Sequence, residues 1–316
     1  MKSLPRQAGL RSRAPALRPA RYARRMAPEH PRRFVGPADL HLHSNHSDGT
    51  EAPAEVVRQA HAHGLRTIAL TDHDRTTGWG EAAEATAALG MTFLPGMELS
   101  AKHDWRSVHV LGYLFDPDDA ALRAETDRIR GDRIGRAERI VRSIGRDYDL
   151  HWDDVLAQTT PDATVGRPHI ADALVARGIV RDRTEAFDGI LHPREGYYEP
   201  HYAPDPLTAV RLITDAGGVA IIAHPVTSGR DRMMPMSFLE QLIDAGLGGF
   251  EIDHRENTEA GKALLRELAA RRDLIVTGSS DYHGSGKPNR PGENTTSDEM
   301  VERLIARASG TTPRYP

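Results

Sequence analysis

The chain has 316 residues, a formal net charge of −4, a pI near 6.5 and no cysteine. This length suits one large α/β domain, alone or with an insertion, and the charge argues against binding duplex nucleic acid through a general basic field. The lack of cysteine excludes disulfides, thiolate metal sites and cysteine nucleophiles, so any metal must be held by histidine, aspartate and glutamate.

Residues 1–37 differ in composition from the rest of the chain. They contain nine arginines and one lysine but a single acidic residue, Glu29, with prolines scattered among them. We expect a disordered leader, or a start of translation nearer Met26. An Arg-rich transit peptide is the alternative, and no apolar segment of a secretory signal is present. The chain also lacks the roughly eighteen consecutive apolar residues of a membrane span, and a cytoplasmic location fits this composition.

From residue 38 onward, short apolar runs alternate with amphipathic stretches. A first strand leads into His41 and His43, and Pro53 suits the first turn of a helix that Gly64 ends. The pattern then predicts helix 53–63, strand 66–70, helix 78–89, strand 91–94 and strand 108–115. Such alternation is typical of parallel βα units, and in barrels of these units the carboxyl ends of the strands carry the chemistry.

The alternation stops between residues 116 and 204. Residues 118–146 form a long charged stretch of helical character, and shorter helices are predicted at 152–158 and 167–177, without an evident strand. We interpret residues 116–204 as a helical insertion over one end of a barrel that residues 38–115 and 205–310 form. In the second part the pattern predicts helix 207–216, strand 219–223, helix 238–245, strand 249–253, helix 259–271, strand 274–277 and helix 298–308.

Candidate metal ligands lie where strands end or turns begin. His41 and His43 are two residues apart, so both imidazoles point the same way on a strand, and Asp48 lies in a turn that can fold its carboxylate towards them. Imidazole nitrogens and a carboxylate suit a divalent metal. The same chemistry recurs at His73, Glu98, His109, His224, Asp281 and His283. Each alone could be structural, because single motifs are weak signals, but their recurrence in one α/β pattern favours a shared metal site.

The order of these motifs resembles the PHP (polymerase and histidinol phosphatase) family of metal-dependent phosphoesterases. Between Asp39 and Lys287 the motifs are HxHSxxSDGT, TDHD, GMELS, VHVLGY, GRPHIADAL, AHP and SDYHG. The resemblance implies an α/β fold, a distorted (β/α)7 TIM-like barrel with an inserted helical subdomain, that holds three divalent metal ions. It implies one ion on His41, His43, Glu98 and Asp281, a second on His109 and His224 with Glu98 as bridge, and a third on Asp48, His73 and His283.

The expected donor atoms are nitrogen and oxygen only, which suits Mn²⁺, Zn²⁺ or Fe²⁺, and the resemblance favours Mn²⁺. Ions bridged by a carboxylate lower the pKa of water and clamp the attacking and leaving oxygens of a phosphoryl group. Glu98, as the bridge, is therefore expected to be catalytic. No side-chain nucleophile is then needed, and the sequence has no GxSxG motif.

Substrate contacts are expected from residues near these ligands. Arg167 and His169 lie in Gly-Arg-Pro-His at the start of a predicted helix, and a helix N-terminus beside an arginine is an anion site. Arg167 is expected to neutralise the phosphate during the reaction. Lys287, just past the last ligand, is a further candidate for phosphate binding, although loop lysines are often only solvated.

Two further expectations concern side chains around the ligands. His254 follows a barrel strand and could face the site as a proton donor, at a position where relatives often have an aromatic residue. Asp72 and Asp74 flank His73 and are expected to orient its imidazole.

The leading functional hypothesis is hydrolysis of phosphate esters of nucleotides. The GRPH helix and the insertion resemble the stand-alone branch of the family, which removes the 3′-phosphate of nucleoside 3′,5′-bisphosphates or trims short RNA from its 5′ end. Histidinol-phosphate phosphatase is the alternative within this chemistry. The expected partner is a small phosphate ester or a short oligonucleotide, without duplex nucleic acid, membrane or obligate protein partner.

Two hypotheses of other classes also remain. An amidohydrolase likewise opens with HxH on a barrel strand, but it typically bridges its metals with a carboxylated lysine where Glu98 stands here. A non-catalytic metal-binding module serving a larger polymerase is the other. Mass analysis or a metal count of Glu98→Ala would separate the phosphoesterase from the amidohydrolase. A lack of phosphate release from any nucleotide with Mn²⁺ would favour the module.

Overall fold

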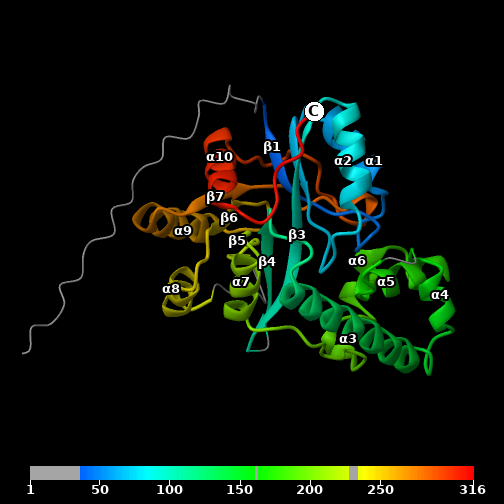
Figure 1. The fold of residues 1–316 in the computed structure, drawn as a ribbon. Helices are drawn as coiled ribbons and strands as arrows, with labels where there is room; N and C mark the ends of the chain where they lie inside the picture. The colour runs from blue at the N-terminus through cyan, green and yellow to red at the C-terminus, as the bar shows by residue number, and fades with distance from the viewer. Residues whose placement is uncertain (1–35, 105, 161–162, 228–233) are drawn as a thin grey trace, which may run out of the picture. The chain divides into compact units, whose positions relative to one another are not determined.

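We describe a computed structural model of the chain for residues 36–104, 106–160, 163–227 and 234–316. The predicted leader, except for its last two residues, lies outside the described residues, and so does most of the loop after Thr227. Seven strands form one sheet in the order of the sequence, which Figure 1 shows with its surrounding helices. Leu42, the last residue of the first strand, bridges Tyr282 beyond the last strand, so the sheet is a nearly closed barrel.

The predicted strands and helices are present with their ends shifted by a few residues, except that β3 continues to His103, well past the predicted end at residue 94. The strands are β1 (Ala38–Leu42), β2 (Thr67–Leu70), β3 (Thr92–His103), β4 (Arg106–Tyr113), β5 (Val219–Ile222), β6 (Gly249–Asp253) and β7 (Ile275–Gly278). The helices are α1 (Pro53–Ala62), α2 (Trp79–Ala88), α3 (Ala120–Ile144), α4 (Trp152–Leu156), α5 (Arg167–Ala176), α6 (Arg183–Asp188), α7 (Pro206–Asp215), α8 (Met236–Asp244), α9 (Glu259–Arg272) and α10 (Asp298–Arg307). The sequence analysis missed α6, because six residues with only Ala186 buried give no helical apolar pattern.

The prediction of parallel βα units is wrong for β4. This strand runs antiparallel to both β3 and β5, whereas the other neighbouring pairs are parallel. Two strands that follow each other without a crossover helix can pair only in the antiparallel direction. The reversal places the start of β4 beside the end of β3, with His109 opposite Ser100. A histidine near the beginning of a strand therefore reaches the rim where the parallel strands end.

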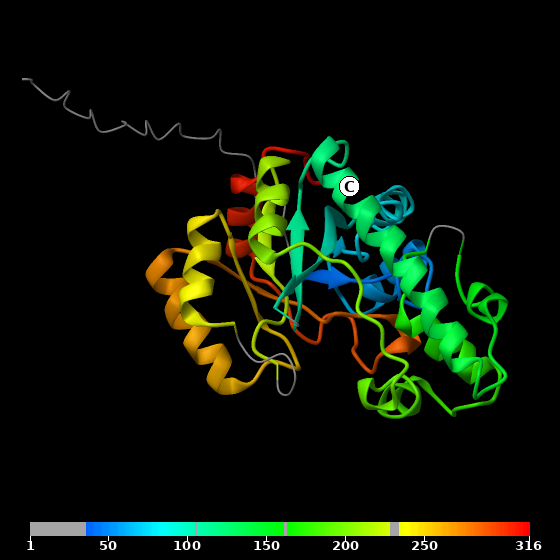
Figure 2. The ribbon, with the colours of Figure 1, turned by 90° about the horizontal axis from the view of Figure 1, so that it is seen from below.

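Helices with one apolar face cover the outside of the barrel. In α7, Asp205 caps the first turn by accepting the Leu207 N–H, and Ala209, Val210 and Ile213 are fully buried. Together with α8 and α9, this helix packs on β3 to β6 in the largest apolar cluster, while α1 and α2 pack on the opposite part of the sheet. Figure 2 shows these helices around the strands. Burial of the apolar faces, at about 25 cal/mol per Å², stabilises the barrel.

Helices α3 to α6 have an apolar core of their own. Ile140 and Ile144 of α3 pack with Ile170 and Leu174 of α5 and with Leu191 in one buried cluster. Within the described residues, no strand lies between Tyr113 and Val219. The division into a barrel of residues 38–115 and 205–310 and a helical insertion of residues 116–204 stays a prediction.

The helical segment also contacts the barrel rim. Thr164, just before α5, donates from its hydroxyl to the carbonyl of His73 at 2.8 Å, and from its N–H to the carbonyl of His46 at 3.0 Å. These bonds place the start of α5 beside the predicted ligands. Across the described parts of the chain, no helix has the length and apolar character needed to cross a bilayer.

Candidate metal centre

All nine side chains predicted as metal ligands lie together at one rim of the barrel. They come from β1 and the turn after it, from the segment after β2, from β3 and β4, and from the segments after β5 and β7. Eight of them form three groups in which the donor atoms lie within 4.8 Å of one another. These groups are His43, Asp48, His73 and His283; His41, His43, Glu98 and Asp281; and His73, Glu98 and His109.

Glu98 lies at the centre of this arrangement. Its side chain is only 1% exposed, and it reaches the rim because β3 continues through Glu98 instead of ending before it. Its two carboxylate oxygens lie within 3.5 Å of ring nitrogens of His41, His43, His73, His109 and His224. Burial alone would raise the pKa of Glu98, but the surrounding histidines hold it well below its ordinary value. The ionised carboxylate is therefore in a position to bridge two ions.

The donor atoms of this cluster are arranged to bind divalent ions rather than to form hydrogen bonds with one another. The buried atoms Asp48 Oδ1, His73 Nδ1, Glu98 Oε2 and His283 Nε2 have no hydrogen-bond partner among the described residues. The Nε2 atoms of His41 and His43 face each other at 3.0 Å, and both lie 3.0–3.1 Å from Glu98 Oε2. Buried polar atoms left without partners are costly, so lone pairs that converge in this way fit bound cations.

Hydrogen bonds behind the imidazoles fix which ring nitrogen faces the cluster. The Nδ1–H of His283 donates to the carbonyl of Asp281 at 2.9 Å, because a carbonyl can only accept. The lone pair of His283 Nε2 is then directed towards Asp48 Oδ1, 3.1 Å away. In the same way His43 Nδ1 lies 3.3 Å from the Ser47 hydroxyl, leaving Nε2 for the cluster. Such outer contacts are typical of histidines that bind metals.

Backbone strain accompanies two of the candidate ligands. His224 and Asp281 have positive φ angles of 30° and 55°, a region that residues other than glycine rarely occupy. Both follow barrel strands, and the strained turns direct their side chains back over the rim. The N–H of His224 donates to Oε2 of Glu251 at 2.9 Å, which holds its turn in place. Strain of this kind persists where the surroundings impose it, often at functional sites.

The expectation that Asp72 and Asp74 orient the His73 imidazole is wrong in its contacts. The Asp72 carboxylate accepts hydrogen bonds from the Ser44 N–H and from the hydroxyls of Ser44 and Ser47. Asp74 accepts from the N–H and hydroxyl of Ser100. Both carboxylates therefore tie the His73 segment to the loops that carry the other ligands. Serines beside the ligand motifs donate to these two carboxylates instead. The position of the two aspartates next to His73 in the sequence did not reveal these partners.

Glu251 and Asp39 are two buried carboxyl groups that the sequence analysis did not assign. Glu251 on β6 accepts from His41 Nδ1 at 2.9 Å. Burial alone would raise the pKa of Glu251, but the His41 charge and hydrogen bond lower it to about 2. Asp39 on β1 accepts the N–H groups of Ser280 and Gly292 at 3.1 and 2.8 Å. An acidic residue with an apolar residue on each side, within a predicted strand, was the available signal for both.

The residues predicted to bind substrate differ in how deeply they are buried. Arg167 is half-buried at the start of α5, with its guanidinium carbon over the rings of Phe187 and Tyr198. His169 is buried, and its Nδ1 accepts the Gly166 N–H at 3.1 Å, so one of its nitrogens caps α5. Lys287 Nζ lies 2.6 Å from Asp281 Oδ2, and it therefore contacts a candidate ligand directly.

His254 faces the cluster from the end of β6. It is fully buried, and its Nε2 lies 3.8 Å from Asp281 Oδ2. Its Nδ1 accepts the Glu256 N–H at 3.3 Å, so in the neutral ring the hydrogen is on Nε2. Nε2 has no hydrogen-bond partner among the described residues. The proton of His254 is thus directed at the site.

Comparisons with known proteins agree with this geometry. A model of the PHP domain matches residues 39–155. A 3′,5′-nucleoside bisphosphate phosphatase of Chromobacterium violaceum is 34% identical over 80% of this chain and 89% of its own length. A phosphoribosyl 1,2-cyclic phosphate 1,2-diphosphodiesterase of Eggerthella lenta is 32% identical over 78% and 94%. A 5′-3′ exoribonuclease of Haemophilus influenzae is 31% identical over 78% and 89%.

A solved structure has the same fold. It is described as a metal-dependent phosphoesterase of Bifidobacterium adolescentis, and it superposes with a TM-score of 0.85 at 39% sequence identity. The match covers 87% of this chain and 98% of that one. The whole barrel and the helical segment therefore have a counterpart of the same extent.

Proposed function

We propose a specific reaction for this chain from the premise that it belongs to the PHP family of metal-dependent phosphoesterases. It is a hydrolase of nucleotide phosphate esters, and the reaction that we propose is removal of the 3′-phosphate from nucleoside 3′,5′-bisphosphates, with trimming of short RNA from the 5′ end as a related activity. The names of the Chromobacterium and Haemophilus relatives support this choice. We place the enzyme in the cytoplasm.

We propose that three divalent ions bind at the rim. His41, His43, Glu98 and Asp281 would hold the first, Glu98, His109 and His224 the second, and Asp48, His73 and His283 the third. The nitrogen and oxygen donors suit Mn²⁺ as our first choice and Zn²⁺ or Fe²⁺ as alternatives. Such ions lower the pKa of water and neutralise charge on the oxygens of a phosphoryl group.

The observation that carries this proposal is the convergence of buried donor atoms without hydrogen-bond partners around Glu98. A protein that held no ions would have to bury these lone pairs and charges uncompensated, which is expensive. The same position argues against an amidohydrolase that bridges its metals with a carboxylated lysine, because Glu98 occupies the centre here.

We assign three further roles to the chain's own residues. His254 gives its Nε2 proton to the leaving oxygen, since that proton faces the site and has no other described acceptor within hydrogen-bond distance. Arg167 neutralises charge on the substrate at the start of α5. His169 and Lys287 keep the α5 N-terminus and Asp281 in place beside the substrate.

A phosphate-release panel tests the proposed function. Purified protein supplied with Mn²⁺, Zn²⁺ or Fe²⁺ would be offered adenosine 3′,5′-bisphosphate, adenosine 5′-monophosphate, short RNA, histidinol phosphate and a ribose 1,2-cyclic phosphate. We expect the bisphosphate to be the best substrate. Activity confined to histidinol phosphate would contradict the nucleotide assignment, and activity confined to the cyclic phosphate would favour the reaction named for the Eggerthella relative. Release of neither phosphate nor nucleotides from any of these compounds would favour a non-catalytic module.

A further inference from the structure

Arg183, the first residue of α6, joins the helical segment to the turn that carries Asp48. Its Nη1 donates to the main-chain carbonyl of Asp48 at 3.3 Å. Its Nε and Nη2 each donate to one carboxylate oxygen of Asp172 on α5 at 2.6 Å. The Arg183 side chain is only 15% exposed. The planar guanidinium therefore binds a carboxylate through two parallel hydrogen bonds and keeps a further N–H group for the turn.

The same guanidinium lies against the segment that follows β7. A Cβ atom at Gly286 would collide with Nη1 of Arg183, so the arginine lies directly on the backbone of this glycine. Gly286 belongs to the short helical turn that begins just after His283. The N–H of Thr50, just past the Asp48 turn, donates to the carbonyl of His283 at 3.2 Å. Arg183 thus packs where the turn of Asp48 and the segment of His283 meet.

Asp48 and His283 are two of the three ligands that we propose for the third ion. Oδ1 of Asp48 lies 3.1 Å from Nε2 of His283, and neither atom has a hydrogen-bond partner among the described residues. Asp48 lies in a turn beyond the end of β1, and residues of connecting segments are more mobile than residues of strands. A contact that fixes this turn therefore also fixes the distance between the two donor atoms.

Asp172 balances the charge of Arg183. An unpaired guanidinium beside a metal ion would repel that ion, because charges in a partly buried site are only weakly screened. The double hydrogen bond pairs the guanidinium with the Asp172 carboxylate, which is only 26% exposed. The pair therefore provides a hydrogen-bond donor for the turn of Asp48 while it adds little net positive charge beside the ion.

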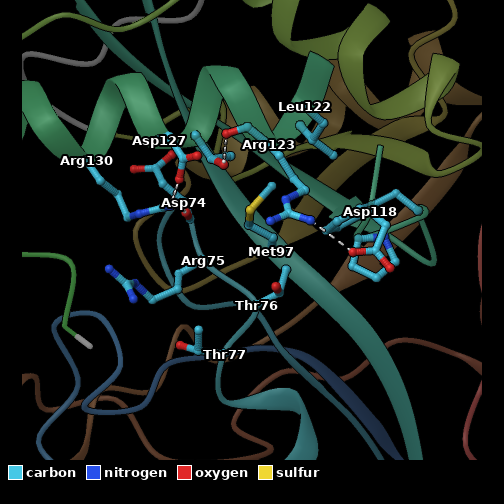
Figure 3. Close-up of a pocket in the computed structure, with 13 residues that line it drawn as sticks. Asp74, Arg75, Thr76, Thr77, Met97, Asp118, Leu122, Arg123, Asp127 and Arg130 are labelled. Carbon is cyan, nitrogen blue, oxygen red and sulfur yellow. Dashed lines mark hydrogen bonds and ion pairs between the residues drawn. The ribbon is translucent and has the colours of Figure 1, made fainter. Parts of the chain in front are cut away.

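Arg130 makes a contact of the same kind from α3, on a more open side of the molecule. It donates to the carbonyl of Asp74, the residue after a candidate ligand. Its carboxylate partner Asp127 is on the same helix and is 67% exposed, and exposed ion pairs contribute little to stability. Figure 3 shows Arg130 and Asp74 at a cavity of about 300 Å³. The less exposed partner of Arg183 therefore makes Arg183 the more firmly held of the two arginines.

We propose that Arg183 is a positioning residue for the third ion. Held by Asp172, it fixes the turn of Asp48 against the segment of His283, so that both donor atoms face one ion. The inference rests on the three-ion site of the proposed function and extends it, because a residue of α6 that binds no ion itself determines how tightly one of the three ions is bound.

Metal titration of Arg183→Gln tests this role. Wild-type protein, freed of metal with a chelator, is expected to bind three Mn²⁺ ions per chain in a calorimetric titration, and elemental analysis provides a second count. In Arg183→Gln one of the three ions should bind about 10- to 100-fold more weakly, as when other supporting contacts of metal ligands are lost. The other two should keep their affinity, because Arg183 lies beside the third group of ligands.

Arg183→Lys separates the position of the side chain from its charge. Lysine keeps the positive charge but lacks the planar fork that binds Asp172 and the turn at the same time, so one ion should be weakened as in Arg183→Gln. Wild-type affinity in Arg183→Lys would overturn the positioning role. Should Arg183→Gln fail to fold, Asp172→Asn leaves the guanidinium without its counter-charge and should weaken the same ion, and wild-type affinity there would overturn the role as well.

Arg181→Gln is the matched control. Arg181 lies just before α6, is 84% exposed and pairs with Glu185 at 3.0 Å. All three ions should bind to Arg181→Gln as they bind to the wild type. Thermal unfolding of each variant without metal checks that it is folded.

The outcomes distinguish a failure of this inference from a failure of the proposed function. Three ions bound with wild-type affinity in Arg183→Gln, or an equal loss of affinity for all three, would overturn the role of Arg183 and leave the proposed function intact. Wild-type protein that binds fewer than three ions would overturn both the three-ion assignment and the role of Arg183. Phosphate release from nucleotides by that protein would still support the proposed reaction.

Discussion

The Nδ1 atom of His41 lies 2.9 Å from Oε1 of Glu251, although 210 positions separate the two residues in the chain. Both side chains are fully buried. Because an ionised carboxylate only accepts, His41 carries a hydrogen on Nδ1, and its Nε2 faces Glu98 at 3.1 Å. The same Glu251 holds the turn of His224 through its second oxygen. One residue of β6 thus orients one candidate ligand on β1 and another in the segment after β5.

Replacing this carboxylate should weaken metal binding. Glu251→Gln keeps the size of the side chain but removes its charge, and an amide can donate towards His41 as well as accept. We expect metal affinity to fall about 10- to 100-fold, measured by competition with a chelator and by elemental analysis. Asp253→Asn on the same strand, where the carboxylate pairs with Arg266, is the control. Wild-type metal affinity in Glu251→Gln would refute this role.

Removal of the metals should inactivate and destabilise the protein. Ions that bind only the folded chain stabilise it, and without them the carboxylates of Asp48, Glu98 and Asp281 stay close together in a buried site. We expect a chelator to abolish phosphate release and to lower Tm by several degrees, and Mn²⁺ to restore both. An unchanged Tm after complete metal removal, verified by elemental analysis, would mean that the ions do not stabilise the folded protein.

His254→Asn should slow the reaction without emptying the site. If His254 protonates the leaving oxygen, kcat for a nucleotide should fall about 10²- to 10⁴-fold, because an unprotonated ribose alkoxide is a poor leaving group. An aryl phosphate, whose leaving group needs no proton, should lose much less. Elemental analysis should find the wild-type metal content. Equal losses on both substrates would assign His254 a structural role instead.

Stability should depend on pH through His201. Burial, and next the charge of Arg133, lower the pKa of His201 from 6.5 to about 3. Between these values the unfolded chain binds a proton at His201 that the folded chain does not. The contribution of this group is therefore fully present above pH 6.5 and is lost as the pH falls towards 3.

Urea unfolding at several pH values measures this effect. Between pH 6 and 4 the free energy of unfolding of the wild type should fall more steeply than that of His201→Gln, by at most about 1.4 kcal/mol per pH unit. Both proteins share every other titrating group, so the difference isolates His201. Parallel curves over this range would show that His201 is protonated in the folded state.

The sequence by itself determined the elements and the chemical types at the rim. Strands such as β6 and helices such as α9 were predicted within a few residues, because apolar periodicity and capping residues act locally. The spacing of His41 and His43 placed this pair on one face for the same reason. The family motifs added the order in which these groups occur.

Only the tertiary structure decided how the groups meet. The reversal of β4 brings His109 to Glu98, and it depends on how the strands pair. The alternation of apolar and polar residues along a strand does not tell whether the strand runs parallel or antiparallel to its neighbours. The same is true of Glu251 behind His41, since the two residues lie on different strands. Burial and long-range contact determine whether a carboxylate orients an imidazole, and this property cannot be computed from neighbours in the chain.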